Sequence, residues 1–336
     1  MKRLVTVLAL VAGCSVATVA PAQTLTACRA FVDDAERLAC YDRLVGDAAT
    51  ATPAATAPEP ASAPESAPAP SLLGKAWELD PGERGRILRI RPYKPVYILP
   101  WFHAQNPNHT PHSPAVGHSG APVGFSSNEV KFQIGFKSKL GEDLIGDNGD
   151  LWFGYTQSSR WQLYNADDSR PFRETDYEPE VMFLWRTDYD FLGWRGRFVS
   201  LGVNHQSNGR SLPLSRSWNR VMFAAAFERG DWTLTVRPWW RIPEGSSDDN
   251  PDITHYLGRA DVHLVRDWGK QQFSLLLRHN LRGGSGSRGA AQLDYAFPIA
   301  GQLRGHLQWF SGYGESLVDY NHRGNYYGVG VSLVEW

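Results

Sequence analysis

The stretch 201–207 (Leu-Gly-Val-Asn-His-Gln-Ser) has the pattern of a β-strand and contains a histidine and a serine two positions apart. Successive side chains of a strand point to opposite faces, so His205 and Ser207 share one face, which is otherwise apolar. Two strand positions span roughly 6.6 Å, a distance across which an imidazole can reach a hydroxyl group. A histidine that activates a neighbouring serine is the arrangement used in nucleophilic catalysis.

A second strand pattern supplies an asparagine. Asn219 begins an apolar row that continues with Val221, Phe223, Ala225 and Phe227. If the two strands are neighbours, the Asn219 amide could hold the second ring nitrogen of His205, which is the orienting role in a catalytic triad. Unrelated surface groups can have the same spacing, but polar groups on an apolar face are costly without partners. The pattern therefore predicts Ser207, His205 and Asn219 as catalytic residues.

Strand patterns run from about residue 88 to the end of the chain. Twelve segments, most of them bounded by Gly, Pro, Asn or Asp, are predicted as strands at 93–104, 129–139, 150–164, 177–189, 193–207, 216–229, 231–241, 254–267, 271–281, 289–297, 302–312 and 325–336. Connections after even-numbered segments tend to be short, and those after odd-numbered segments are long, as at 105–128, 165–176, 208–215 and 242–253. This alternation is typical of an outer-membrane barrel.

We therefore predict an all-β fold, a transmembrane 12-stranded antiparallel β-barrel, with a soluble β-sandwich as the alternative. The 13 Trp and 13 Tyr residues would form aromatic girdles at the two membrane interfaces. The outward rows of such a barrel are apolar, so the three predicted catalytic residues face lipid near the outer rim. Their natural substrate is then the lipid itself. The net charge of −1 gives no indication of nucleic-acid binding.

Residues 1–22 have the features of a secretory signal peptide, with a basic start, an apolar stretch and a small-residue cleavage site ending at Ala22. A lipoprotein signal with Cys14 as the modified residue is the alternative. No later segment approaches the roughly 18 consecutive apolar residues that a membrane-spanning helix needs. Under either type of signal, the protein is expected to leave the cytoplasm.

The mature chain is expected to begin with a short Cys-containing helical hairpin at 23–46. A bend at Val32–Asp33 would bring Cys28 and Cys40 together, and an oxidising compartment favours a disulfide over two free thiols. An Ala/Pro-rich linker follows at 47–87 and is expected to be disordered. The barrel then occupies 88–336.

Several longer motifs resemble the outer membrane phospholipase A family. They are 155–157 (Tyr-Thr-Gln), 171–179 (Pro-Phe-Arg-Glu-Thr-Asp-Tyr-Glu-Pro), 204–211 (Asn-His-Gln-Ser-Asn-Gly-Arg-Ser), 215–220 (Ser-Arg-Ser-Trp-Asn-Arg), 248–254 (Asp-Asp-Asn-Pro-Asp-Ile-Thr) and 311–317 (Ser-Gly-Tyr-Gly-Glu-Ser-Leu). The resemblance implies a phospholipase of the cell outer membrane that hydrolyses sn-1 and sn-2 acyl esters, with its active site facing the outer leaflet. It implies Ser207 as nucleophile, His205 as general base and Asn219 as orienting residue, with a homodimer as the active form.

The same resemblance implies Ca²⁺ as cofactor. One ion in the dimer would be held by Ser169 of one subunit and by the Arg210 carbonyl and Ser215 hydroxyl of the other, all of them hard oxygen ligands. Asp249 would belong to a second, monomer-type site, where the acidic partner of the family pattern is replaced by Leu212. An ordinary solvated turn at 248–252 is the alternative.

Gln157 is predicted as the contact of the homodimer. It lies on the outward face of the strand at 150–164, where an amide needs polar partners that a second barrel could provide. A non-enzymatic, porin-like channel lined by Arg220, Glu228 and Arg237 is the main rival function, although twelve strands leave a narrow lumen. A periplasmic peptidoglycan- or partner-binding protein anchored through the 23–46 hairpin is the second.

Overall fold

The computed structural model describes residues 28–29, 31–49, 71–85, 87–120 and 122–334. The chain divides into two compact units, Met1–Pro68 and Ala69–Trp336. The predicted signal peptide, the alternative lipid site at Cys14 and most of the Ala/Pro-rich linker lie outside the described residues. In the part of the chain that is described, no helix is long and apolar enough to cross a membrane.

The N-terminal unit contains helix α2, Asp34–Ala49. The Asp33 carboxylate accepts hydrogen bonds from the backbone N–H groups of Ala35 and Glu36, which caps the helix. Cys28 and Cys40 form the predicted disulfide, with their Cα atoms 5.6 Å apart. The first arm of the predicted hairpin lies largely outside the described residues.

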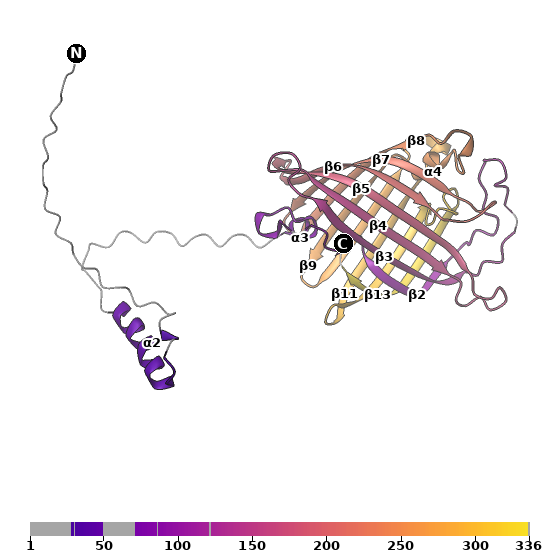
Figure 1. Cartoon of the computed structure of the whole chain (residues 1–336). Coiled ribbons are helices and arrows are strands. Elements are labelled where there is room, and N and C mark those ends of the chain that lie inside the picture. Colours follow the sequence, from indigo (N-terminus) through magenta and orange to yellow (C-terminus); the bar gives the residue numbers. More distant parts are fainter. Residues whose placement is uncertain (1–27, 30, 50–70, 86, 121, 335–336) are drawn as a thin grey trace, which may run out of the picture. The chain divides into compact units, whose positions relative to one another are not determined.

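The second unit is a closed antiparallel barrel of twelve strands, as predicted (Figure 1). The barrel strands are β2 (Val96–Ala104), β3 (Asn128–Gly141), β4 (Asp150–Trp161), β5 (Phe172–Phe191), β6 (Trp194–Ser207), β7 (Ser217–Arg229), β8 (Trp232–Ile242), β9 (Ala260–Trp268), β10 (Gln271–His279), β11 (Gly289–Ala300), β12 (Leu303–Tyr313) and β13 (Arg323–Val334). Each strand pairs with its neighbours in the chain, and β13 pairs with β2 to close the ring. Closure leaves no strand edge unpaired, which is what a bilayer demands of a sheet.

Three predicted strand boundaries were wrong. The strand predicted at 93–104 begins only at Val96, and a two-residue strand β1 (Arg91–Pro92), which was not predicted, precedes it and pairs with β3. β5 starts at Phe172, within the predicted loop 165–176. The start of the strand predicted at 254–267 is helix α4 (Ile253–Leu257), because Ile253 and Leu257 lie four residues apart and pack together in a buried cluster.

The connections define two ends of the barrel. The turn end carries the connections 142–149, 192–193, 230–231, 269–270 and 301–302, and the loop end carries 105–127, 162–171, 208–216, 243–259, 280–288 and 314–322. Short 3₁₀ helices lie in two of the long connections, at η2 (Gly245–Ser247) and η3 (Gly284–Gly286). Turns face the periplasm and long loops face outward in this class of barrel. The loop end is therefore the outer end.

Part of the predicted linker packs against the turn end of the barrel. Residues Leu72–Trp77 form helix α3, capped by the Ser71 hydroxyl, and the 3₁₀ helix η1 (Pro81–Glu83) follows. Leu73 belongs to a buried cluster with inward-facing barrel side chains, and its backbone N–H donates to Glu228 across 2.9 Å. The predicted linker at 47–87 thus extends too far, because its last part has apolar residues to bury.

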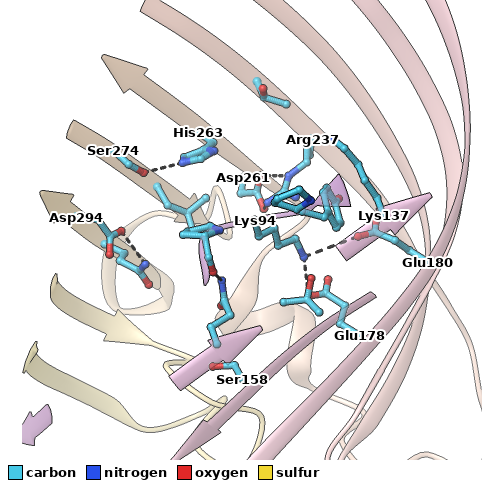
Figure 2. A pocket seen from close by; sticks show the side chains of 18 of the residues that line it. Lys94, Lys137, Ser158, Glu178, Glu180, Arg237, Asp261, His263, Ser274 and Asp294 are labelled. Atoms are coloured by element: carbon cyan, nitrogen blue, oxygen red, sulfur yellow. Dashed lines mark hydrogen bonds and ion pairs between the residues drawn. The ribbon is translucent and has the colours of Figure 1, made fainter. Parts of the chain in front are cut away.

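Paired charges fill the lumen of the barrel (Figure 2). Lys94 donates to Glu178 across 2.8 Å and lies 3.8 Å from Glu180. The guanidinium of Arg237 contacts the carboxylate of Asp261 at 2.8 Å. Buried charges are tolerated where they are paired. A cavity of about 830 Å³ remains among these side chains.

Candidate active site on the outer wall

Strand alternation places the predicted row of β6 on the lipid-facing wall. Leu201 and Val203 are 49% and 54% exposed, whereas Asn204 between His205 and Val203 is buried on the lumen side. Phe223 on the neighbouring strand β7 is 49% exposed as well. His205 therefore lies at the loop end of an apolar outer surface, as the sequence predicted.

His205 and Asn219 face each other in the ladder between β6 and β7, and His205 Nδ1 lies 2.8 Å from Asn219 Oδ1. An amide oxygen can only accept, so the imidazole donates from Nδ1 and keeps Nε2 as its basic nitrogen. The pair thus has the orientation that a general base requires.

Glu244 fixes the direction of the Asn219 amide. Asn219 Nδ2 donates to Glu244 Oε1 across 2.7 Å, which keeps the amide oxygen turned toward His205. Glu244 follows β8 in a connection at the loop end, where burial raises the pKa of its carboxyl group. The sequence alone does not indicate Glu244, because it lies 25 positions from Asn219 and only the pairing of β7 with β8 brings the two together.

Ser207 lies two positions beyond His205 on the same face of β6. It is half-buried and pairs with Tyr177 of β5 and Ser217 of β7. No hydrogen bond among the described residues joins Ser207 to His205. Catalytic hydrogen bonds are often long or poorly aligned without substrate. The structure therefore brings two of the predicted catalytic residues into contact and places the third beside them.

Parts of this constellation recur elsewhere in the barrel. His103 of β2 faces Asn128 of β3, with Nδ1 and Oδ1 2.9 Å apart, but the residue two positions further on is Gln105. In the lumen, His263 Nε2 lies 2.7 Å from the hydroxyl of Ser274 (Figure 2). Of the three places, only the site on β6 and β7 combines serine, histidine and asparagine.

A groove of about 380 Å³ borders the pair of His205 and Asn219. The side chains that line it include the partly exposed Phe153, Val181, Val203 and Ile242 from four different strands. These outward, apolar residues form a surface on which a hydrocarbon chain can pack. The basic nitrogen of the imidazole therefore lies next to a surface suited to an acyl chain.

The residues predicted to bind metal lie in the connections at the loop end. The Ser215 hydroxyl donates to Asp249 Oδ2 across 2.7 Å. Arg210 belongs to the same connection as Ser215, and its guanidinium donates to the Phe172 carbonyl. Ser169 is exposed in the connection between β4 and β5. The structure thus joins Ser215 to Asp249, and among the described residues no hydrogen bond joins Ser169 to either of them.

Asn208 organises the connection that carries Arg210 and Ser215. Its side-chain oxygen accepts from the backbone N–H groups of Arg210 and Arg216, and its amide nitrogen donates to Glu174 and to the Leu214 carbonyl. A buried amide with all of these bonds made fixes the loop conformation. The sequence analysis did not assign a role to Asn208, although it directly follows Ser207 and precedes a glycine.

The available donors suit calcium better than a transition metal. In the described ranges, no group of three or more His, Cys, Asp or Glu residues could hold a metal ion. The residues at the loop end instead offer a hydroxyl, a carboxylate and backbone carbonyls, which are the hard oxygen ligands that calcium prefers. This donor set fits Ca²⁺, provided that further oxygen ligands come from water or from a second subunit.

The predicted dimer contact Gln157 lies on β4, on the outer wall. Contrary to the expectation of an unpaired amide, the Tyr155 hydroxyl donates to Gln157 Oε1 across 3.0 Å. Gln157 Nε2 lies 3.4 Å from the Ser159 hydroxyl, at the long end of hydrogen-bond geometry. The three side chains form a polar row on an otherwise lipid-facing surface.

Fold and site together define an integral outer-membrane β-barrel with a hydrolase-type histidine–asparagine pair on its lipid-facing wall. A family model described as phospholipase A1 matches residues 73–333. Phospholipase A1 of Escherichia coli strain K12 is 44% identical over 206 residues, covering 61% of this chain and 70% of that protein.

Solved structures agree with this match. The calcium-bound dimer of the outer membrane phospholipase from Salmonella typhi has a TM-score of 0.67 at 36% identity and covers 78% of this chain and 98% of its own. An active-site mutant of E. coli outer membrane phospholipase A, with asparagine replaced by alanine, has a TM-score of 0.69 at 36% identity, with 79% and 99% covered. The chain belongs to the outer membrane phospholipase A1 family of carboxylic ester hydrolases.

Proposed function

We propose that the chain hydrolyses both the sn-1 and the sn-2 acyl esters of phospholipids, using Ser207, His205 and Asn219. The observation that carries this proposal is the 2.8 Å contact between His205 Nδ1 and Asn219 Oδ1 on the lipid-facing wall. The apolar groove beside that contact supports a lipid substrate. The position of the site toward the loop end supports access from the outer leaflet.

In the proposed reaction, Ser207 Oγ attacks the ester carbonyl carbon while His205 Nε2 accepts the hydroxyl proton. The proton passes to the glycerol oxygen as the C–O bond breaks, which releases a lysophospholipid and leaves the acyl group on Ser207. His205 then takes a proton from water, whose oxygen attacks the acyl carbon. The bond between that carbon and Ser207 Oγ breaks, His205 returns the proton to Ser207 Oγ, and the fatty acid is released. Backbone N–H groups near Ser207, such as that of Gly209, are the proposed donors that stabilise the oxyanion.

Asn219 holds the imidazole during both proton transfers. A neutral amide suits this position, because an ionised carboxylate on a lipid-facing surface would be costly to desolvate. A relative from E. coli supports this role, because its variant with an asparagine replaced by alanine is described as an active-site mutant. Glu244 completes the chain of contacts by holding the far side of the Asn219 amide.

Calcium is the proposed cofactor. Ser215 and the Arg210 carbonyl would hold it together with Ser169 of a second subunit. Asp249 would belong to a second, monomer-type site, which lacks its acidic partner because residue 212 is leucine. When bound, calcium would supply positive charge that stabilises the oxyanion of acyl transfer. The S. typhi relative was crystallised as a dimer with bound calcium, which supports both the metal and the homodimer.

The test is fatty-acid release from defined phospholipids in mixed micelles, with calcium or with excess chelator. We expect hydrolysis at both acyl positions, only with calcium, and an increased calcium requirement in the Ser215→Ala variant. Heat-modifiable gel mobility should show the same folded barrel in both conditions, since the proposed ligands lie outside the strand ladder. Full activity in excess chelator would refute the role of calcium.

A further inference from the structure

Both carboxylate oxygens of Asp249 already have protein partners. Oδ2 accepts from the Ser215 hydroxyl at 2.7 Å and lies 3.4 Å from the Ser217 hydroxyl. Oδ1 lies 3.1 Å from His118 Nε2. A calcium ion bound directly to Asp249 would have to share its oxygens with these contacts, which already use most of the roughly four acceptor positions of a carboxylate. The carboxylate is thus arranged to hold side chains.

The partner His118 comes from the long connection 105–127 and is itself firmly held. It is 4% exposed, and its Nδ1 lies 3.0 Å from the Val116 carbonyl. The same turn contacts the backbone of Asp249, because the Ser113 hydroxyl donates to the Asp249 carbonyl across 2.6 Å. The backbone N–H of Ser113 donates to the His118 carbonyl, which closes the turn. The connection 105–127 therefore contacts both the side chain and the main chain of Asp249.

Leu212 lies next to this turn, with its side chain 59% exposed. A Cβ atom added to Gly117 would lie 3.4 Å from Leu212 Cδ1, so a side chain at position 117 would contact the leucine. Gly117 adopts a φ of 82°, a conformation that side-chain-bearing residues rarely take. Leu212, which replaces an acidic partner in the family pattern, thus lies beside the turn that delivers His118.

We propose that His118 and Asp249 form a positioning pair for the Ser215 hydroxyl and that Asp249 is not itself a calcium ligand. The inference rests on the proposed calcium role of Ser215. A serine hydroxyl has one proton, and donating it to Asp249 leaves both oxygen lone pairs for a metal ion. Carboxylates placed behind a metal ligand orient it and increase its basicity, and their loss typically costs about tenfold or more in metal affinity. His118 keeps the carboxylate in the orientation that this requires.

The test uses the full-length protein in detergent and measures calcium-dependent dimerisation by sedimentation and calcium binding by calorimetry. We expect Asp249→Asn and His118→Ala each to increase the calcium concentration for half-maximal dimerisation, by about tenfold for Asp249→Asn. The double variant should be no worse than Asp249→Asn alone, because His118 acts through Asp249. His118→Gln, which keeps an N–H donor, should restore most of the affinity.

His112→Ala is the matched control, since His112 lies in the same connection with an exposed side chain that contacts the Thr110 carbonyl rather than Asp249. It should bind calcium like the parent. The proposal is overturned if His118→Ala behaves like this control, if the two losses are additive, or if Asp249→Asn removes a whole calcium-binding event and leaves the affinity of the remaining site unchanged. If Ser215→Ala has no effect on calcium-dependent dimerisation, the proposed calcium site fails instead.

Discussion

At the scale of single residues, the outer wall offers an unusual internal control. His103 and Asn128 reproduce the contact between His205 and Asn219 on the same lipid-facing wall, with 2.9 Å against 2.8 Å, but lack a serine two positions on. We expect His205→Ala to reduce fatty-acid release on the order of a thousandfold or more, since a nucleophile without its base is inert. His103→Ala should leave the rate close to that of the parent. Equal losses in the two variants would mean that the histidines act through stability.

The serine assignment can be tested by covalent labelling. A sulfonylating reagent that partitions into micelles should modify Ser207 alone, because Ser274 contacts a histidine but lies buried in the lumen. Ser207→Ala should abolish both labelling and hydrolysis while the barrel remains heat-modifiable. Mass spectrometry of the labelled peptide identifies the site. Label on Ser274, or label that persists in the Ser207→Ala variant, would refute the assignment.

A third prediction concerns the hydrogen bonds from Glu244 through Asn219 to His205. Glu244→Gln retains an oxygen that can accept from Asn219, so we expect nearly parental activity, whereas Glu244→Leu should lower activity as Asn219→Ala does. The raised pKa of the Glu244 carboxyl means that folding favours its protonated form. Its contribution to stability is therefore present at low pH and is lost as the pH rises through that pKa. At neutral pH, Glu244→Gln should unfold at the same temperature as the parent or slightly higher.

At the scale of secondary-structure elements, the features that depend on local sequence pattern could be predicted from the sequence. Period-two alternation predicted which side of β6 and β7 faces lipid, and the alternation of short and long connections predicted the direction of every strand. Helix α4 could not be predicted in this way, because it exists through the contacts of Ile253 and Leu257 with residues of other strands, among them Trp218. Glu244 was missed for the same reason, since its partner is set by strand pairing.

The prediction for the dimer concerns Gln157 on strand β4. The Gln157 amide has one 3.0 Å contact and one long contact within its own barrel, so a second barrel can still supply hydrogen-bond partners. We expect Gln157→Leu to weaken the calcium-loaded dimer in sedimentation and to lower specific activity at low protein concentration. Gln133 on the neighbouring strand β3 is the control, because it faces the lumen, where a second barrel cannot reach it, and its amide donates to the Pro95 carbonyl at 2.8 Å. If Gln157→Leu remains as dimeric as Gln133→Leu, another surface forms the contact.

At the scale of the whole molecule, charged and aromatic side chains narrow the lumen of the barrel around a cavity of about 830 Å³. Twelve strands already imply a narrow lumen, but the sequence could not show how its charges pair. Near the loop end, Glu315 binds Lys131, Arg160 and Arg173 at 2.8 to 3.3 Å. At the turn end, Trp77 of α3 packs against Trp152 and Phe198, and the Lys137 ammonium lies over its ring. Both ends of the lumen are therefore obstructed by side chains.

This filling predicts that the protein does not conduct ions. In planar bilayers, the parent and the Ser207→Ala variant should both lack the steady conductance of a porin, because an ion would have to displace paired, buried charges along the barrel axis. Leu73→Ala should destabilise the barrel by about 2–5 kcal/mol through the cavity it leaves under α3. It should still not conduct, since the cluster around Glu315 remains in place. Steady channels in the parent would support a porin-like function for this barrel. Channels that appear only in Leu73→Ala would show that α3 alone closes the lumen.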